Sequence, residues 1–238
     1  MIEGKAVPLI FIVIVLLMSF LRPVQTQDST SPNKTNWDVP DRAYTFDFPH
    51  DKILLKDQMV AAVLRQLTFC KRRLDGHSVL LGSCARHDCE NRINLFVGYI
   101  IEAGEKYNLN PWMLAAMAYN ESRFNPFAVG IVHERGIFQM NPASKRGKKT
   151  RFVQDAVYRR SCKNIPGNCQ EDLVNLAAEH IRSAIDKCGG SWVGGLSMYN
   201  GGTCGIRAKY VYKTRKVWKA LEKESSPKLP WCDRPRDL

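Results

Sequence analysis

The sequence predicts a mainly helical domain whose loops are tied by disulfides. Three observations support this prediction. Apolar residues recur at three- and four-residue steps, alternating strand patterns are scarce, and all 8 cysteines lie from Cys70 onward. The chain has 238 residues, 45% hydrophobic and 24% charged, which suffices for one well-buried domain with extensions.

The helical stripes follow one another after residue 50. The first begins near Asp51, and a second passes through residues 93–101 and ends near Tyr107. Asn110-Pro111 has the form of an N-cap followed by proline at the first helical position, so a third helix is expected from there. Further helical patterns cover about 171–187 and 206–222. The inward faces of the first and last helices are predicted to hold Ile53, Leu54, Met59, Val60, Val63, Leu64 and Leu67, and Val211, Thr214, Trp218 and Leu221.

An uncharged apolar run, Ala6–Leu21, follows Lys5 near the N-terminus. Its length is short for a comfortable membrane span but fits the hydrophobic region of a secretory signal. The chain is therefore expected to be exported to the periplasm or the cell exterior. Residues 1–24 would be cleaved as a signal peptide or kept as a membrane anchor through 6–21; a buried helix of a soluble domain is the remaining alternative. Residues 25–50 are predicted to be a linker, 51–224 the folded domain and 225–238 a C-terminal extension.

The cysteines fit an exported protein, in which an even number suggests up to four disulfides. Cys162 and Cys169 are predicted to close a small loop around the turn-prone segment 164–168, and Cys188 and Cys204 bracket a glycine-rich stretch. A zinc site is the alternative, although the spacing of its residues fits no standard signature. These residues are Cys70, His77, Cys84, His87 and Cys89.

Basic residues outnumber acidic ones by 35 to 23, which gives a formal net charge of +12. This excess favours an anionic partner such as nucleic acid, a membrane surface or a cell-wall polymer. The sequence contains no nucleic-acid-binding motif and no phosphate-cradling loop, so no nucleic-acid partner is predicted.

The most informative stretch runs from Ala115 to Pro142, AAMAYNESRFNPFAVGIVHERGIFQMNP. An apolar helix runs into Glu121, and Asn125-Pro126 breaks it. A carboxyl at the end of an apolar helix is expected to be partly desolvated, which favours its protonated form and allows it to donate a proton. Taken alone, a glutamate in this position is more often a solvated residue at a helix end, and the motifs around it decide for the catalytic interpretation.

Four short motifs follow one another along the chain: ESRFNPFAV at 121–129, GIFQ at 136–139, NLAAEHI at 175–181 and MYNGG at 198–202. In this order they resemble the motifs of the soluble lytic transglycosylase (SLT) domain, a family of the lysozyme-like superfamily. In that family the catalytic glutamate is followed by serine, the second motif is Gly-Leu-Met-Gln, and the last is Ala-Tyr-Asn-Gly/Ala-Gly. The resemblance covers about residues 100–215 and is greatest to small specialised members that accompany secretion or conjugation machinery, or that occur on phage.

The resemblance implies a lysozyme-like helical fold of the goose-type and SLT kind, with residues 51–224 as a catalytic domain that cleaves peptidoglycan glycan strands without a metal or cofactor. Glu121 would be the single general acid/base. It would protonate the β-1,4 bond between N-acetylmuramic acid (MurNAc) and N-acetylglucosamine (GlcNAc), and the muramic 6-hydroxyl would then close a 1,6-anhydro ring. Ser122, Gln139, Tyr199 and Asn200 would bind substrate, with the phenol of Tyr199 holding the glutamate. The alternatives are that Gln139 and Asn200 only satisfy loop backbone and that Tyr199 belongs to the core.

The sequence departs from the family's Ser-x-x-Gly-Ala pattern at Gly130–Arg135. Two other functions therefore stay open. A goose-type lysozyme-like hydrolase would need a positioned water and a second acid, such as Glu134 or Asp155. A catalytically silent glycan-binding component of a secretion or virion assembly would need neither. The basic run Lys145–Arg151 is either a solvated loop or a contact for acidic peptide stems or wall polymers.

Overall fold

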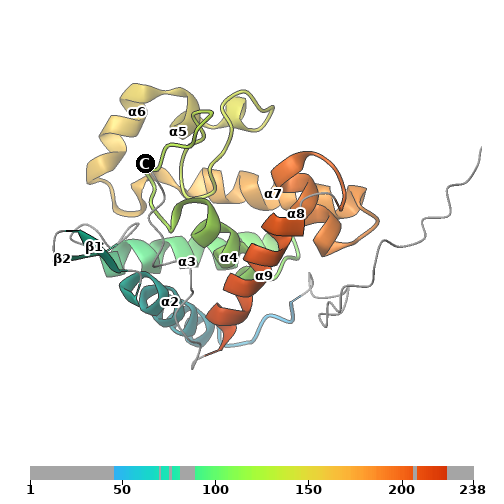
Figure 1. The fold of residues 1–238 in the computed structure, drawn as a ribbon, viewed down its shortest axis with the longest axis horizontal. Coiled ribbons are helices and arrows are strands. Elements are labelled where there is room, and N and C mark those ends of the chain that lie inside the picture. The colour runs from blue at the N-terminus through green and yellow to red at the C-terminus, as the bar shows by residue number, and fades with distance from the viewer. Residues whose placement is uncertain (1–45, 70, 75–76, 81–88, 206–207, 224–238) are drawn as a thin grey trace, which may run out of the picture. The chain divides into compact units, whose positions relative to one another are not determined.

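A computed structural model describes residues 46–69, 71–74, 77–80, 89–205 and 208–223 (Figure 1). All of them belong to the compact unit Val39–Leu238. The longer helices are α2 (Lys52–Phe69), α3 (Cys89–Lys106), α4 (Pro111–Ser122), α7 (Glu171–Lys187), α8 (Trp192–Gly201) and α9 (Ala208–Glu222). Strands β1 (Lys71–Leu74) and β2 (His77–Leu80) form an antiparallel hairpin in which Lys71 pairs with Leu80. The prediction of a mainly helical fold is confirmed.

Helix α4 is the buried centre of the domain. It packs against α3 and α9 (Figure 1), and every residue from Pro111 to Tyr119 is buried. It begins where the sequence predicts: the side-chain oxygen of Asn110 accepts from the backbone N–H of Trp112 at 2.9 Å, and Pro111 occupies the first helical position. The helix ends at Ser122 because the next residue has a left-handed backbone with φ 53°.

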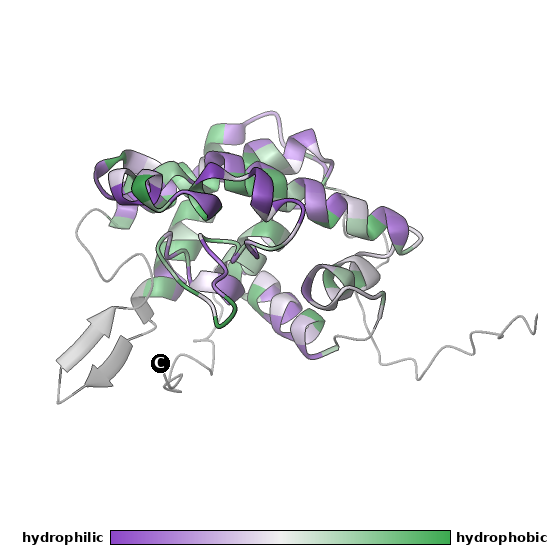
Figure 2. Cartoon of the chain, turned by 90° about the horizontal axis from the view of Figure 1, so that it is seen from above, coloured by the Kyte–Doolittle hydropathy of each residue, from purple (hydrophilic) through white to green (hydrophobic). Residues whose placement is uncertain are grey.

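Helices α7, α8 and α9 pack in sequence, with α8 in contact with both neighbours. The approach of α8 to α7 is close, since a Cβ on Gly195 would lie 2.3 Å from Cγ1 of Ile185 and 2.9 Å from its backbone. On the other side, Trp192 of α8 packs edge-on against Trp218 of α9, with 5.6 Å between ring centroids. The long helices carry both polar and apolar residues around their circumference (Figure 2), as expected when one face packs inward.

The connection between α4 and α7 is built from short elements at one side of the helices (Figure 1). They are η2 (Gly147–Lys149), α5 (Arg151–Gln154), α6 (Ala156–Ser161), η3 (Cys162–Asn164) and η4 (Pro166–Cys169). The predicted Cys162–Cys169 disulfide is present and closes this segment. A second disulfide, Cys188–Cys204, spans α8.

The inward face of the last helix is confirmed, because Val211, Thr214, Trp218 and Leu221 are all buried. For the first helix the prediction is wrong at two positions, since Ile53 is 75% and Leu54 54% exposed. The stripe that faces the core begins at Leu55 and consists of Leu55, Met59, Ala62, Val63, Gln66 and Leu67.

Cys89, one residue of the zinc alternative, is disulfide-bonded, which removes it as a thiolate ligand. The remaining four residues of that alternative lie outside the part of the chain whose side chains the structure describes. Within the described part, no three His, Cys, Asp or Glu side chains are grouped so that they could hold a metal ion. No described helix is both long and apolar enough to cross a membrane. The predicted export segment, most of the linker and the C-terminal extension lie outside the described residues.

Candidate active site

Glu121 lies in the last turn of α4, where the helix leaves the core, and its side chain is half-buried. Its Oε1 accepts a hydrogen bond of 2.6 Å from the phenol of Tyr210. Tyr210 belongs to α9, 89 residues further along the chain, so the packing of α9 on α4 creates this contact. A phenol that donates to a carboxylate both stabilises the charge and fixes the direction of the oxygen.

Tyr210 is itself held by polar groups of the same two helices. The hydroxyl of Thr214, one turn further along α9 and fully buried, hydrogen-bonds the phenol. Thr214 in turn accepts a 3.0 Å hydrogen bond from Nδ2 of Asn120, the neighbour of Glu121 in α4. Burial, and then the charge of Glu121, raise the pKa of Tyr210 well above its ordinary value, so the phenol keeps its proton and remains a donor. The bonds form a closed path from Asn120 through Thr214 and Tyr210 to Glu121.

The turn Gly136–Met140 faces the end of α4 and is held from three sides. The hydroxyl of Ser122 donates to the carbonyl of Ile137 at 2.9 Å, and the N–H of Ile137 donates to the buried amide oxygen of Gln170 at 2.9 Å. The phenol of Tyr199 donates to the carbonyl of Phe138 at 3.1 Å. The first, second and fourth motifs are thus joined by hydrogen bonds to one turn.

Gln139 has a left-handed backbone with φ 46° and a half-buried side chain. Its amide nitrogen donates to the carbonyls of Gly136 at 2.9 Å and Ala128 at 3.2 Å. Within the described chain no donor reaches its Oε1, which is therefore available to accept from a ligand. The alternative that Gln139 only satisfies loop backbone therefore holds for its amide nitrogen, whereas its amide oxygen is left to bind a ligand.

Tyr199 and Asn200 lie at the end of α8. The Tyr199 ring packs against His180 of α7, in the third motif, with ring centroids 5.0 Å apart. Burial, and then the charge of Glu121, raise the pKa of Tyr199 well above its ordinary value, so this phenol keeps its proton and remains a donor. Asn200 is exposed, and its amide has no bonding partner in the described part of the chain.

Tyr210 was not among the site residues predicted from the sequence. Tyr199 was predicted to hold the glutamate, whereas the phenol that donates to Oε1 of Glu121 belongs to Tyr210. A signal was present, because Tyr210 precedes the buried Thr214 by four residues and the buried Val217 by seven, and therefore lies on the inward stripe of its helix.

Asp155, one candidate for a second acid, caps helix α6. Its carboxylate accepts from the backbone N–H of Val157 at 2.8 Å and Tyr158 at 2.9 Å, and it pairs with Arg151 at 3.5 Å. These bonds hold the pKa of Asp155 below its ordinary value, and the bond from the N–H of Tyr158 has the largest effect. A carboxylate with these partners serves to begin a helix and is poorly suited to donate a proton.

Glu134, the other candidate, lies in the loop that the sequence identifies as a departure from the family pattern. Its Oε2 accepts from the N–H of Val132 at 3.0 Å. A Cβ added to Gly130 would be 2.2 Å from Oε2 of Glu134 and 2.9 Å from Oε1 of Gln139. The two oxygens therefore face the same glycine, and Glu134 stands beside a predicted substrate-binding residue.

The basic run Lys145–Arg151 is partly engaged within the protein. Arg146 lies 3.7 Å from Glu179, and Arg151 stacks on Tyr158 at 4.4 Å besides pairing with Asp155. Lys145, Lys148 and Lys149 are exposed. His180 lies near Arg146, and burial, followed by the charges of Arg146 and Lys187, lowers its pKa from 6.5 to about 4.

A comparison with curated proteins gives no match. The family model described as the transglycosylase SLT domain matches residues 98–220, more than half of the chain. The match begins in α3 and ends in α9, and it includes Glu121, Gln139, Tyr199 and Tyr210. The protein belongs to the transglycosylase SLT domain family, whose fold is lysozyme-like and whose substrate is peptidoglycan.

Proposed function

We propose that the protein is an exported peptidoglycan lytic transglycosylase in which Glu121 is the single general acid/base. The observation that carries this proposal is the placement of Glu121 at the end of a buried helix, with its carboxyl bonded by the phenol of Tyr210 at 2.6 Å. The apolar segment Ala6–Leu21 and the disulfides of the described cysteines favour export.

In the proposed reaction the protonated Glu121 donates its proton to the oxygen between MurNAc and GlcNAc. The bond from muramic C1 to that oxygen breaks, and its electron pair stays with the GlcNAc oxygen. The N-acetyl group of the substrate stabilises the positive charge at C1. The muramic 6-hydroxyl then attacks C1 and gives its proton to the Glu121 carboxylate, which restores the acid. No water is consumed, and the tethered hydroxyl has the entropic advantage of an intramolecular nucleophile.

Two features support a reaction with one carboxylate. The Tyr210 phenol can hold the glutamate in place while it passes between its two protonation states. Asp155 is occupied as a helix cap, so it is a poor second acid. Gln139, with its free Oε1, and the exposed amide of Asn200 are the groups best placed to bind the N-acetyl sugars.

A lysozyme-like hydrolase is the second candidate, and Glu134 is the observation that favours it. This carboxylate faces the same glycine as Gln139 and would be the base that activates water in an inverting or water-assisted reaction. Replacing Glu134 with Gln would abolish hydrolysis but leave a transglycosylase close to wild-type activity.

The test of the proposal is Glu121→Gln, which keeps the shape of the side chain and removes its proton transfer. Release of soluble fragments from purified peptidoglycan is expected to fall by about 100- to 10,000-fold, the usual contribution of general acid/base catalysis. Co-sedimentation with insoluble peptidoglycan should persist. If release continues at the wild-type rate, or if the wild-type protein binds but releases nothing, the proposal is wrong.

A further inference from the structure

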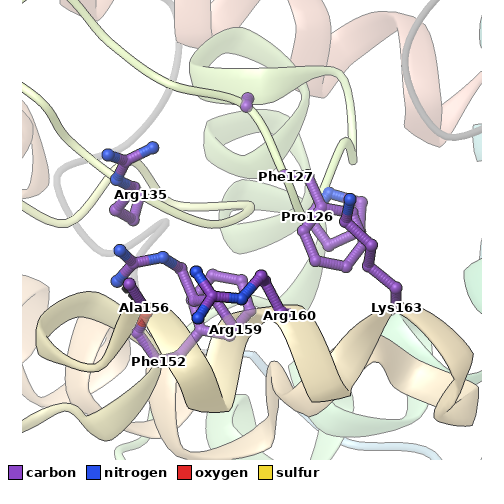
Figure 3. Close-up of a pocket in the computed structure, with 9 residues that line it drawn as sticks. Pro126, Phe127, Arg135, Phe152, Ala156, Arg159, Arg160 and Lys163 are labelled. Carbon is purple, nitrogen blue, oxygen red and sulfur yellow. Dashed lines mark hydrogen bonds between the residues drawn. The ribbon is translucent and has the colours of Figure 1, made fainter.

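A pocket of about 240 Å³ lies between the segment that follows Glu121 and the short helices of the α4–α7 connection (Figure 3). Phe127 and Phe152 form part of its wall, with ring centroids 6.1 Å apart. The charged lining consists of Arg135, Arg159, Arg160 and Lys163, all of them cationic. Figure 3 shows Arg135 on one side of the pocket and Arg159 and Arg160, from α6, on the other.

The positive charge of this pocket is little neutralised by the protein. Arg135, Arg160 and Lys163 make no ion pair or side-chain hydrogen bond within the described residues. Arg159 is fixed by its own donors, since Nη1 bonds the backbone carbonyls of Phe152 at 2.8 Å and Val153 at 2.6 Å. The nearby carboxylate, Asp155, is already committed to the N-terminus of α6 and to Arg151.

Arg135, Arg159 and Arg160 line the same pocket, so their positive charges act on one another. Burial first, and then the charge of Arg135, lower the pKa of the Arg159 guanidinium; Arg160 acts in the same direction, and Asp155 opposes them. Like charges held together repel, and the repulsion grows as water is removed. An anion that enters the pocket would relieve this repulsion and would gain charge-assisted hydrogen bonds from the guanidinium groups.

The pocket is continuous with the candidate active site along the chain. Pro126, in its wall, follows Glu121 by five residues. Arg135 exchanges backbone hydrogen bonds with Met140, the neighbour of Gln139, at 2.8 and 3.1 Å. A ligand held here would therefore lie beside the loop that carries Gln139. The mixture of aromatic rings and cations suits a chain with apolar side groups and carboxylates better than it suits an uncharged sugar.

We propose that this cationic pocket binds a carboxylate of the peptide stem that peptidoglycan carries on its muramic acid, so that the protein selects stem-bearing glycan. This inference rests on the proposed function, because it assumes that glycan strands occupy the site of Glu121. The stem is linked to the muramic acid and presents free carboxylates. The stem lies beside the bond that is cleaved, which explains why a cationic pocket adjoins the loop that carries Gln139.

The test compares the full chain with Arg160→Gln/Lys163→Gln, which removes two unpaired pocket cations and leaves the hydrogen-bonded Arg159 in place. The matched control is Lys106→Gln/Lys219→Gln, which removes the same charge from exposed lysines that do not line the pocket. Equal thermal unfolding of all three proteins establishes that they fold. The substrates are peptidoglycan freed of other anionic polymers, the same material with stem carboxylates converted to amides, and glycan stripped of its stems.

The wild-type protein and the control are expected to cleave the untreated substrate about tenfold faster, as kcat/KM, than the amidated one, a ratio that corresponds to roughly one charge-assisted contact. The pocket variant should reduce this ratio to less than about twofold. The inference is overturned if the pocket variant slows cleavage of all three substrates by the same factor, or if it slows cleavage of none of them. The inference is also overturned if the pocket variant cleaves more slowly than the wild type only after an anionic phosphate polymer has been restored to the peptidoglycan.

A hydrolase in place of a transglycosylase would change the end groups of the products and leave the comparison between substrates intact. If the protein does not cleave glycan at all, the result is different: the wild-type protein releases nothing from any of the three substrates. The pocket is then tested by equilibrium binding of a soluble disaccharide-peptide fragment and of its amidated form. Binding of the carboxylate form about tenfold tighter, lost in the pocket variant and kept in the control, supports the inference without catalysis. Equal affinity for the two forms overturns it.

Discussion

The Tyr210–Glu121 hydrogen bond allows a sharp prediction. Tyr210→Phe removes one oxygen from the candidate active site and keeps the ring that packs between α4 and α9. The lost bond is 2.6 Å long and is donated to a carboxylate, so its free energy is about 1.5 to 3 kcal/mol. If the bond positions Glu121 for proton transfer, kcat should fall about 10- to 100-fold. KM should change little, because the phenol is bonded to the glutamate rather than to sugar.

The assay is the initial rate of fragment release from purified peptidoglycan over a range of substrate concentrations. Tyr212→Phe is the matched control, since Tyr212 lies two residues away on α9 with 57% of its surface exposed. It should keep wild-type kcat. Unfolding curves separate positioning from folding, because loss of the hydroxyl is expected to cost at most about 1.5 to 3 kcal/mol of stability and leave the protein folded at the assay temperature. A Tyr210→Phe variant whose kcat stays within about twofold of wild type would show that the bond does not position Glu121.

The remaining predictions concern the framework around the site. Gly195→Ala should destabilise the protein by about 1 to 3 kcal/mol in urea unfolding, because its Cβ would lie 2.3 Å from a side chain of α7. Gly98→Ala in α3, whose Cβ would meet only a lysine side chain at 3.6 Å, should be neutral or stabilising. A larger loss of stability in Gly98→Ala than in Gly195→Ala would contradict the close packing of α7 on α8. The pKa of His180, lowered from 6.5 to about 4, means that the unfolded chain binds more protons between those values. The free energy of unfolding should therefore fall by up to about 3 kcal/mol more in the wild type than in His180→Gln as the pH drops from 6.5 to 4, and parallel curves would disprove this linkage. Ser122→Ala should lower the stability by about 1 to 2 kcal/mol, because a carbonyl of the Gly136–Met140 turn loses its 2.9 Å donor; an unchanged melting temperature would show that the bond contributes nothing.

The parts of the fold that depend on local chemistry could be predicted from the sequence. The start of α4 follows from Asn110-Pro111, since capping is decided by adjacent residues. The inward face of α9 follows from the spacing of Val211, Thr214 and Trp218. The Cys162–Cys169 disulfide closes a short loop, where few competing pairings exist.

Elements that depend on tertiary packing could not be predicted in this way. Helix α8 has Gly194 and Gly195 in its interior, which oppose helix formation in isolation and are favoured only by the close approach of α7. Ile53 has the spacing of a core residue, but the buried face of α2 begins at Leu55, and Ile53 is 75% exposed.

For the candidate site, the sequence indicated which residues gather but not how they bond. The motifs bring Ser122, Gln139 and Tyr199 to one turn, where part of the hydrogen-bonding capacity of each is used to hold backbone. The partner of Glu121 is 89 residues away, and only the packing of α9 on α4 reveals it. The cationic pocket was missed for the same reason, because Arg135 and Arg159 come together only when the α4–α7 connection folds back.

The most direct test of single-glutamate transglycosylation is the mass of the fragments that the full chain, prepared under oxidising conditions, releases from purified peptidoglycan. We predict products one water lighter than hydrolysed fragments and resistant to reduction by borohydride, because the muramic end is closed as a 1,6-anhydro ring. The Glu134→Gln variant should give the same products at a similar rate. Reducible muramic ends, lost in that variant, would contradict single-glutamate transglycosylation and identify Glu134 as the second carboxylate of a hydrolase, the base that activates water.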